Sequence, residues 1–229
     1  MPNKDDWFRG PEWDAQTRDE FFKRLARSRG AYNKAQYARI KAMGLCESGD
    51  PSRIKESLNL LKTVEAEWPE RSEMAMCYLQ MAQCHAALGD QEAAVESFER
   101  CISAQRFYPN VQTHVLLDFP EYIAVNRLRS LYDRALELLD QWQEQSAGTI
   151  FPVDRFTALA TRAVFAHDSK NLQQATELAT QALAVSKVQH SGFRYHSKLG
   201  LVRDADPLLS AVRLLAKGKG LPGKGQHGA

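Results

Sequence analysis

The chain has 229 residues, of which 44% are hydrophobic, and its 30 lysines and arginines nearly balance 28 aspartates and glutamates to leave a net charge of +2. A chain of this length can bury roughly 70% of the surface that its unfolded form exposes, so we expect no cofactor and no disulfide to be needed for folding. The balanced charge excludes a whole-molecule attraction to nucleic acid or to an anionic membrane.

The N-terminus gives no sign of a targeting segment. Residues 1–14 are polar and acidic, and no run in the chain approaches the roughly 18 apolar residues of a membrane-spanning helix. We therefore expect a cytoplasmic protein that does not contact a membrane.

The first 13 residues are predicted to form an irregular arm. Trp7, Phe8 and Trp13 are large aromatic residues, and Gly10 and Pro11 between them prevent a continuous helix. Because exposing three such side chains to water is unfavourable, we expect the arm to pack over the first hairpin as a cap. Docking of a partner is the alternative. Asp14 is placed to begin a terminal helix that ends near Arg27, with three residues on its inner face: Phe21, Phe22 and Leu25.

A helix pair is predicted over residues 31–47 and 52–67. The two helices meet at Gly49, Asp50 and Pro51, and proline suits the first turn of the second helix. The buried stripe of that helix is Ile54, Leu58, Leu61 and Val64. The first helix lacks an aromatic residue at the expected place, so the sequence leaves the repeat register of residues 31–67 open by a few positions.

The most regular stretch is residues 76–102, where two amphipathic helices meet at Gly89 and Asp90. Glycine there can adopt the left-handed conformation that ends a helix, and aspartate can accept hydrogen bonds from the first turn of the next one. Inward positions recur every three or four residues on both sides of this turn. They are Tyr78, Met81, Ala82, His85, Ala94, Phe98, Cys101 and Ile102.

This hairpin resembles a tetratricopeptide repeat. With Gly89 at the turn glycine of the family, Tyr78 occupies the usual aromatic position, Ala82 the small position of the first helix and Ala94 that of the second. His85 stands where the family has tyrosine. The resemblance implies an all-α, right-handed αα-hairpin solenoid with capping helices at both ends, and a role in binding proteins or peptides.

Two further pairs are predicted downstream. Residues 120–128 and 131–145 make the third, after a connection that either hides an early helical turn or is a functional loop, and residues 155–167 and 172–187 make the fourth. Second-helix alanines recur at a near-constant period, because 41 residues separate Ala94 from Ala135 and 40 separate Ala135 from Ala175. Such a period is typical of stacked repeats, although it leaves a HEAT-like pairing open.

The C-terminal part is predicted to cap the repeats. Asp206 and Pro207 begin a short helix within a capping segment, 188–217, so that residues 1–217 form one domain. Residues 218–229 are dominated by glycine and lysine, and we expect them to be a disordered tail. The short sequences around Trp7, Phe151 and Phe193 resemble segments of a group of small bacterial tetratricopeptide-like proteins. This resemblance implies the fold but does not indicate an activity.

The four cysteines, Cys46, Cys77, Cys84 and Cys101, are expected to be buried thiols, because they lie at helical packing positions and form no CxxC pair. A zinc site of three of them with His85 is the alternative, and nothing in the spacing favours it. We expect no metal.

A basic cluster precedes the capping helix. His190, Arg194, His196 and Arg203 alternate there with aromatic and apolar residues. Three interpretations remain open: a structural loop whose aromatic residues pack on the fourth pair while its bases meet carboxylates, an anion or phosphate site, and a catalytic base with cationic partners.

No nucleotide-binding, hydrolase or metalloprotease motif is present in the sequence, so we expect no catalytic residues and no enzyme. The inner face of the first helices is predicted to be a partner-binding groove, mixed in polarity and largely apolar. Its residues are Met76, Leu79, Gln83, Arg127, Val164 and His167. They depart from the lysine and asparagine pattern with which part of the family binds peptide C-termini.

We therefore predict a module that binds an unidentified protein or peptide, with the oligomeric state left open. The alternative is a regulator that binds an anion, phosphate or nucleic acid through the basic loop 190–203, or an enzyme that uses this loop; the charge balance does not favour nucleic acid. The fold by itself does not discriminate among these functions.

Overall fold

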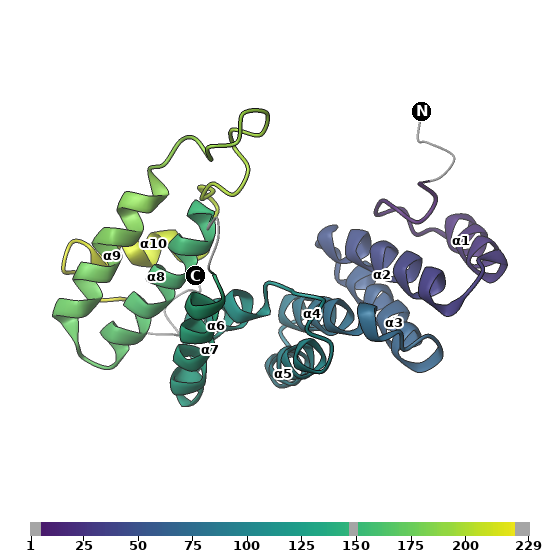
Figure 1. Cartoon of the computed structure of the whole chain (residues 1–229), viewed down its shortest axis with the longest axis horizontal. Helices are drawn as coiled ribbons and strands as arrows, with labels where there is room; N and C mark the ends of the chain where they lie inside the picture. Colours follow the sequence, from purple (N-terminus) through teal and green to yellow (C-terminus); the bar gives the residue numbers. More distant parts are fainter. Residues whose placement is uncertain (1–5, 147–150, 223–229) are drawn as a thin grey trace. The chain divides into compact units, whose positions relative to one another are not determined.

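The computed structural model describes residues 6–146 and 151–222, and within them it contains ten α-helices, one 3-10 helix and no strand (Figure 1). The chain divides into two compact units, residues 1–115 and 116–229. Unit 1 contains two closely packed helix pairs and unit 2 contains one, and the all-helical, hairpin-based class predicted from the sequence is confirmed.

Unit 1 contains two close hairpins and a terminal helix. Helix α1 spans Ala15–Arg27, and the hairpins pair α2 (Ala31–Glu47) with α3 (Pro51–Glu67) and α4 (Arg71–Ala87) with α5 (Gln91–Phe107). Helix α1 packs on α2, and the second hairpin stacks on the first through contacts of α4 with α2 and α3.

The same local chemistry makes both turns. Gly49 and Gly89 have φ values of 70° and 78°, a left-handed conformation that is costly for other residues. Each is followed by an aspartate whose side chain accepts a backbone hydrogen bond, from Ser52 for Asp50 and from Ala93 for Asp90. The predicted boundaries of α2 and α3 are therefore correct to within one residue.

The inward stripes of these helices are buried. Leu61, Val64, Ala82 and Ala94 are fully buried, and Phe98 is 3% exposed. Tyr78 and His85, also predicted to face inward, are half-buried instead. The Tyr78 hydroxyl donates a hydrogen bond to Glu65 Oε1 at 3.2 Å.

The N-terminal arm packs on α1 and α2, as expected. The ring of Trp7 lies 5.4 Å from Phe21 and 5.3 Å from Tyr37 between centroids. Lys41 of α2 is only 3% exposed and holds the arm by donating from Nζ to the carbonyl oxygens of Arg9 at 3.4 Å and Gly10 at 3.1 Å. Phe22 was predicted to face inward but is 40% exposed, because its neighbour Phe21 occupies the inner face of α1.

The connection after α5 hides an early helical turn. Helix α6 spans Val115–Asn126, so Pro120, predicted to begin this helix, lies inside it. An internal proline costs about 3 kcal/mol. Burial of each large apolar side chain contributes about 1.5–3 kcal/mol, and Val115, Leu116, Leu117 and Phe119 are all buried, which outweighs the proline.

The rest of unit 2 consists of the 3-10 helix η1 (Arg129–Leu131), α7 (Tyr132–Gln145), the hairpin of α8 (Pro152–Asp168) with α9 (Leu172–Ser186), and α10 (Leu209–Leu215). Helix α10 packs on both α8 and α9, in the capping position predicted for it. The hairpin is closely packed because its facing positions are small: Ala163, Ala175, Ala179 and Ala182, all buried.

The buried alanine of α5 provides a test of hairpin packing. Ala94→Leu adds three carbons where no space remains, and we expect it to lower the free energy of unfolding by about 1–3 kcal/mol. Ala87→Leu, an equal change at an exposed position of α4, is the control and should have little effect. Urea unfolding followed by circular dichroism measures both, and equal stability of the two variants would contradict the packing described.

Candidate functional site

Three of the six residues predicted for the groove come together in unit 2. Arg127 follows α6, and Val164 and His167 lie on α8. The other three, Met76, Leu79 and Gln83, lie on α4 of unit 1. Gln83 is exposed and Met76 half-buried, whereas Leu79 and Val164 are 4% and 2% exposed and belong to the core.

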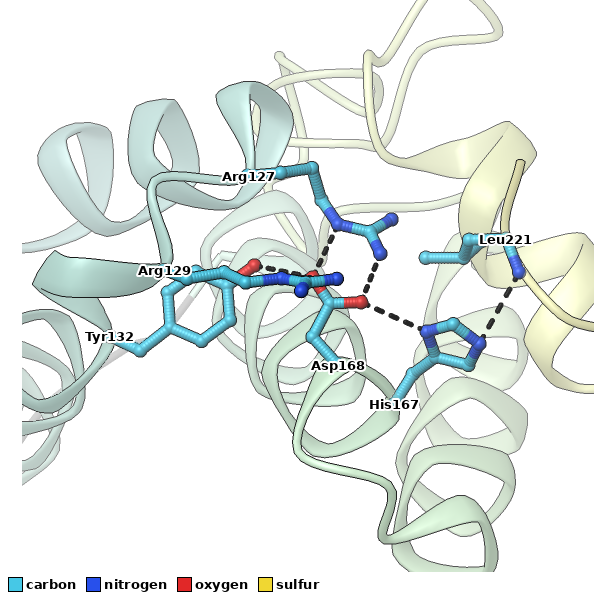
Figure 2. Close-up of polar contacts among 6 residues, drawn as sticks. All are labelled: Arg127, Arg129, Tyr132, His167, Asp168 and Leu221. Atoms are coloured by element: carbon cyan, nitrogen blue, oxygen red, sulfur yellow. Dashed lines mark hydrogen bonds and ion pairs between the residues drawn. The ribbon is translucent and has the colours of Figure 1, made fainter. Parts of the chain in front are cut away.

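The centre of the site in unit 2 is the carboxylate of Asp168, the last residue of α8. Its side chain is 1% exposed. Arg127 donates to it from both Nε and Nη2, the Tyr132 hydroxyl donates to Oδ2 at 2.7 Å, and His167 Nδ1 lies 3.0 Å from Oδ1 (Figure 2). A second arginine, Arg129, places Nε 3.6 Å from Oδ2. We call these five residues the Asp168 cluster.

The cluster is assembled by helix ends. Arg127 follows the last residue of α6, Arg129 begins η1, Tyr132 begins α7, and His167 and Asp168 end α8. The ring of Tyr132 packs on Phe165 of α8 with 4.1 Å between centroids, which aligns its hydroxyl with the carboxylate. Because the last carbonyls of α8 carry partial negative charge, a carboxylate there is unfavourable unless cations and donors surround it.

The electrostatics follow from these contacts. Burial by itself raises the pKa of Asp168, but the hydrogen bonds from Tyr132, His167 and Arg127 and the charge of Arg127 outweigh it and hold that pKa below its usual value. Burial, together with the hydrogen bond to Asp168 and its charge, raises the pKa of Tyr132. Asp168 is therefore ionised and Tyr132 protonated at neutral pH.

His167 has a defined tautomer in this arrangement. Its Nε2 accepts a hydrogen bond from the backbone N–H of Leu221 at 3.3 Å, so the ring proton is on Nδ1 and points to Asp168. Leu221 belongs to the segment that was expected to be a disordered tail. Residues 218–222 are described by the structure and reach α8, whereas residues 223–229 of that expectation lie outside the described residues.

Two adjoining pockets open beside the cluster. One has a volume of about 320 Å³ and is mainly apolar; the other, which we call the polar pocket, has a volume of about 370 Å³ and is lined mostly by charged and polar residues. Arg127, Leu221 and Pro222 line both. The apolar pocket is formed by α6, α8 and α10, and its walls include Val125, Val164, Leu208, Ala211 and Leu214. The polar pocket is lined by Arg129, His167, Asp168 and Lys170.

A half-buried carboxyl group, that of Glu121, lies on α6. Burial raises the pKa of Glu121 to about 7, and the nearby charges of Asp206 and Asp118 act in the same direction. Burial also raises the pKa of Asp206, although its Oδ1 accepts a hydrogen bond from Leu208 N at 3.0 Å, which acts in the opposite direction.

The basic loop before α10 is ordered by its own hydrogen bonds. Ser191 donates from N to the carbonyl oxygen of Ser197 and from Oγ to that of His196, and Phe193 packs on Phe151 at 5.6 Å between ring centroids. Gly200 also lies against Phe151, where a Cβ would come within 2.3 Å of the ring. Aromatic packing on the fourth pair, expected of a structural loop, is thus present.

The bases of this loop do not behave as that interpretation expected. His190, Arg194, His196 and Arg203 are all exposed, and none forms an ion pair with a carboxylate among residues 6–146 and 151–222. Arg194 lies over the ring of Tyr195, which is 82% exposed. The four bases lie on a different segment from the Asp168 cluster, and they line neither pocket.

The cysteines are mostly buried thiols. Cys77, Cys84 and Cys101 are buried and Cys46 is half-buried, and burial raises the pKa of Cys77 to about 12. No group of three or more histidine, cysteine or acidic side chains within the described ranges is arranged to hold a metal ion. No helix in the described part of the chain is both long and apolar enough to cross a membrane.

Sequence reasoning missed Asp168, Arg129, Tyr132 and Lys170. A usable signal existed, because an aspartate at the end of an apolar helix is unfavourable unless cations meet it, and two arginines occur close together at 127 and 129. The sequence could not show that the end of α6, next to Arg127, and the end of α8, at Asp168, lie together in the fold.

The architecture defines a class, a helical-repeat protein with hairpins in both units. Residues 76–108, which contain most of α4 and all of α5, match the family model of the tetratricopeptide repeat. Residues 76–108 are therefore similar to a tetratricopeptide repeat, and the all-helical fold is consistent with a solenoid of that type. Searches of curated proteins and of solved structures find no match. The repeat supports a protein-interaction module in general.

The Asp168 cluster predicts a large effect of one atom. Asp168→Asn keeps the shape of the side chain but leaves Arg127 and Arg129 without their counter-charge, and we expect a loss of roughly 3–5 kcal/mol in unfolding free energy at neutral pH. Because the pKa of Asp168 is lowered in the folded state, its contribution is present above the unfolded pKa and is lost as pH falls. The variant should therefore lose part of its sensitivity to acid.

Asp140→Asn is the matched control for this change. Asp140 pairs with Arg162 at 2.6 Å in the same unit, but its side chain is 65% exposed, so we expect a loss below about 1 kcal/mol. Urea unfolding near pH 7 compares the two variants. Similar losses would show that Asp168 is not the buried centre of the cluster.

Glu121 predicts the opposite dependence on pH. The pKa of Glu121 is about 7 in the folded state, so the folded state binds the proton more tightly than the unfolded state. The free energy of unfolding therefore falls as the pH rises from the ordinary pKa of 4.5 to about 7. This loss is about 2–3 kcal/mol between pH 5 and pH 8. Glu121→Gln should remove it, whereas Glu144→Gln, at an exposed position of α7, should not. Urea unfolding at both pH values decides, and an unchanged pH dependence in Glu121→Gln would refute the assignment.

Proposed function

We propose that the protein binds a segment of a partner protein or peptide in the apolar pocket of unit 2. The observation that carries the proposal is the pocket itself, about 320 Å³, lined by α6, α8 and α10 and bordered by Arg127 of the Asp168 cluster. The tetratricopeptide match supports a partner of this kind in general. Val164, predicted from the sequence to lie in a binding groove, forms part of the lining.

The pocket suits an apolar side chain. Its walls include valine, leucine and alanine side chains on three helices, so little surface has to reorganise when a ligand enters. Val125 at its edge is 43% exposed, and covering it by a partner removes apolar surface from water. Arg127 is fixed by Asp168, and it offers a polar group beside the apolar surface for orientation.

Unit 1 carries a separate candidate surface. Gln83 is exposed and Met76 partly exposed on α4, the first helix of the hairpin that carries the repeat match. Because Leu79 and Val164 are buried, their replacement by charged residues would destabilise the fold before it tested binding.

The basic loop remains the second candidate surface. Arg194, His196 and Tyr195 are exposed together, and this loop has no acidic residue from 188 to 203. We infer that an acidic partner which binds there would be lost in the double variant Arg194→Ala with His196→Ala at unchanged melting temperature. A partner held in the apolar pocket would be retained by that variant.

The test of the pocket uses two variants of α10. Ala211→Trp fills the pocket, whereas Arg213→Trp places the same side chain at an exposed position of the same helix. The tagged full-length chain should capture a discrete protein from a lysate of the source organism. Binding of this protein should weaken at least about tenfold in Ala211→Trp, a change of about 1.4 kcal/mol, and stay unchanged in Arg213→Trp.

Melting temperatures control for folding in this experiment. A captured protein that binds Ala211→Trp and the wild-type chain equally well would reject the pocket as the partner site. Equal loss in both variants at equal melting temperature would place the contact elsewhere on α10.

A further inference from the structure

The polar pocket carries more positive charge than its one carboxylate neutralises. Arg127, Arg129 and Lys170 line it together with Asp168, so three cationic side chains face one carboxylate and leave a surplus of two positive charges. Two nitrogens of Arg127 are bonded to Asp168, and its Nη1 makes no hydrogen bond to a described residue. The side chain of Arg129 is 67% exposed, so its guanidinium is accessible. A surplus of two charges suits a dianion better than a single carboxylate.

Two of these cations occupy backbone positions that favour glycine. Arg127 and Lys170 have φ values of 55° and 66°, and they are the two non-glycine residues with positive φ in the described part of the chain. Both end helices with one hydrogen-bond pattern, which is also that of Gly89: the Asp90 N–H donates to His85, the Leu128 N–H to Ile123 and the Asn171 N–H to Ala166. A side chain in this conformation costs roughly 1–2 kcal/mol, which glycine avoids.

A cation near a helix C-terminus is favourable by itself, by about 0.3–1 kcal/mol. This interaction explains why a lysine or arginine occurs in the last turn of a helix, but it does not require the residue to adopt a left-handed backbone conformation. It does not explain why the two strained positions line the same pocket, beside a third exposed cation. Strain of this kind is typical of functional sites.

We propose that Arg127, Arg129 and Lys170 bind a phosphomonoester dianion in the polar pocket, with the Asp168 carboxylate holding Arg127 in place. A phosphomonoester carries a charge of about −1.5 to −2 at neutral pH, and its three terminal oxygens accept hydrogen bonds from guanidinium and ammonium groups. The two arginines contribute directional donors and Lys170 a mobile charge.

The adjoining apolar pocket specifies the carrier of the phosphoryl group. Because Arg127 borders both pockets, an apolar side chain and a phosphoryl group can be bound side by side. The ligand is therefore a partner segment in which a phosphorylated residue neighbours an apolar one. This part rests on the function proposed above, whereas the binding of the phosphoryl group does not.

The phosphoryl site is tested with inorganic phosphate on the full-length chain. Isothermal titration at constant ionic strength near pH 7.5 should show saturable binding to the wild-type protein. Lys170→Gly removes a cation at a position that glycine prefers, so we expect its melting temperature to be equal or higher while its affinity falls at least about tenfold. Arg129→Gln should have the same effect on affinity, and added sodium chloride should weaken binding.

Arg213→Gln is the matched control, because Arg213 is an exposed arginine of the same unit that lines neither pocket. Its phosphate affinity should equal that of the wild type. Undetectable binding to the wild type, or equal affinity in Lys170→Gly, Arg129→Gln and the wild type, would overturn the phosphoryl site whether or not a partner protein is found.

The carrier is tested with acetyl-leucyl-phosphoserine amide, its unphosphorylated counterpart and inorganic phosphate. We expect the phosphorylated dipeptide to bind at least about tenfold more tightly than phosphate, and the other peptide to bind more weakly than either. Ala211→Trp should remove the advantage of the dipeptide and leave the affinity for phosphate. Equal affinities of dipeptide and phosphate would overturn the peptide carrier and indicate a free phosphate compound as ligand.

Discussion

The arrangement of unit 2 depends on keeping one carboxylate ionised in an interior position. Asp168 is almost without solvent contact, and an isolated charge in such a place would cost several kcal/mol. The cost is offset by groups from four separate helix ends, so burial of the ionised Asp168 requires α6, η1, α7 and α8 to be together. Folding of this unit and formation of the site are therefore one event, and neither pocket can form while these helix ends are apart.

The turns of unit 1 show which features of the fold the local sequence determines. In unit 1 the glycine and aspartate of each turn are sufficient to end one helix and begin the next, and the sequence predicted these boundaries closely. The buried stripes of α3 and α5 and the small residues of α8 and α9 also followed from a period of 3.6 residues. These features are local, and their physics is contained in ten to twenty neighbouring residues.

The rest depended on contacts between distant residues. The start of α6 was misplaced because Pro120 normally marks a helix start, and only the burial of four apolar residues before it outweighs that preference. Phe22 was placed inward by periodicity alone, although Trp7 and Trp13 fill the space around Phe21. The candidate site was found in part, since Arg127 and His167 were named for an inner helix face, while the acid that joins them, Asp168, was not.

Lys41 has a consequence for chemical labelling of the native protein. Its amine is buried between α2 and the arm and donates to two backbone carbonyls, and burial lowers its pKa. An amine-reactive reagent modifies surface lysines directly, but it can reach this one only when the arm detaches. The rate at which Lys41 becomes labelled is therefore a measure of how often the arm around Arg9 and Gly10 leaves its place, obtained without unfolding the helices beneath it.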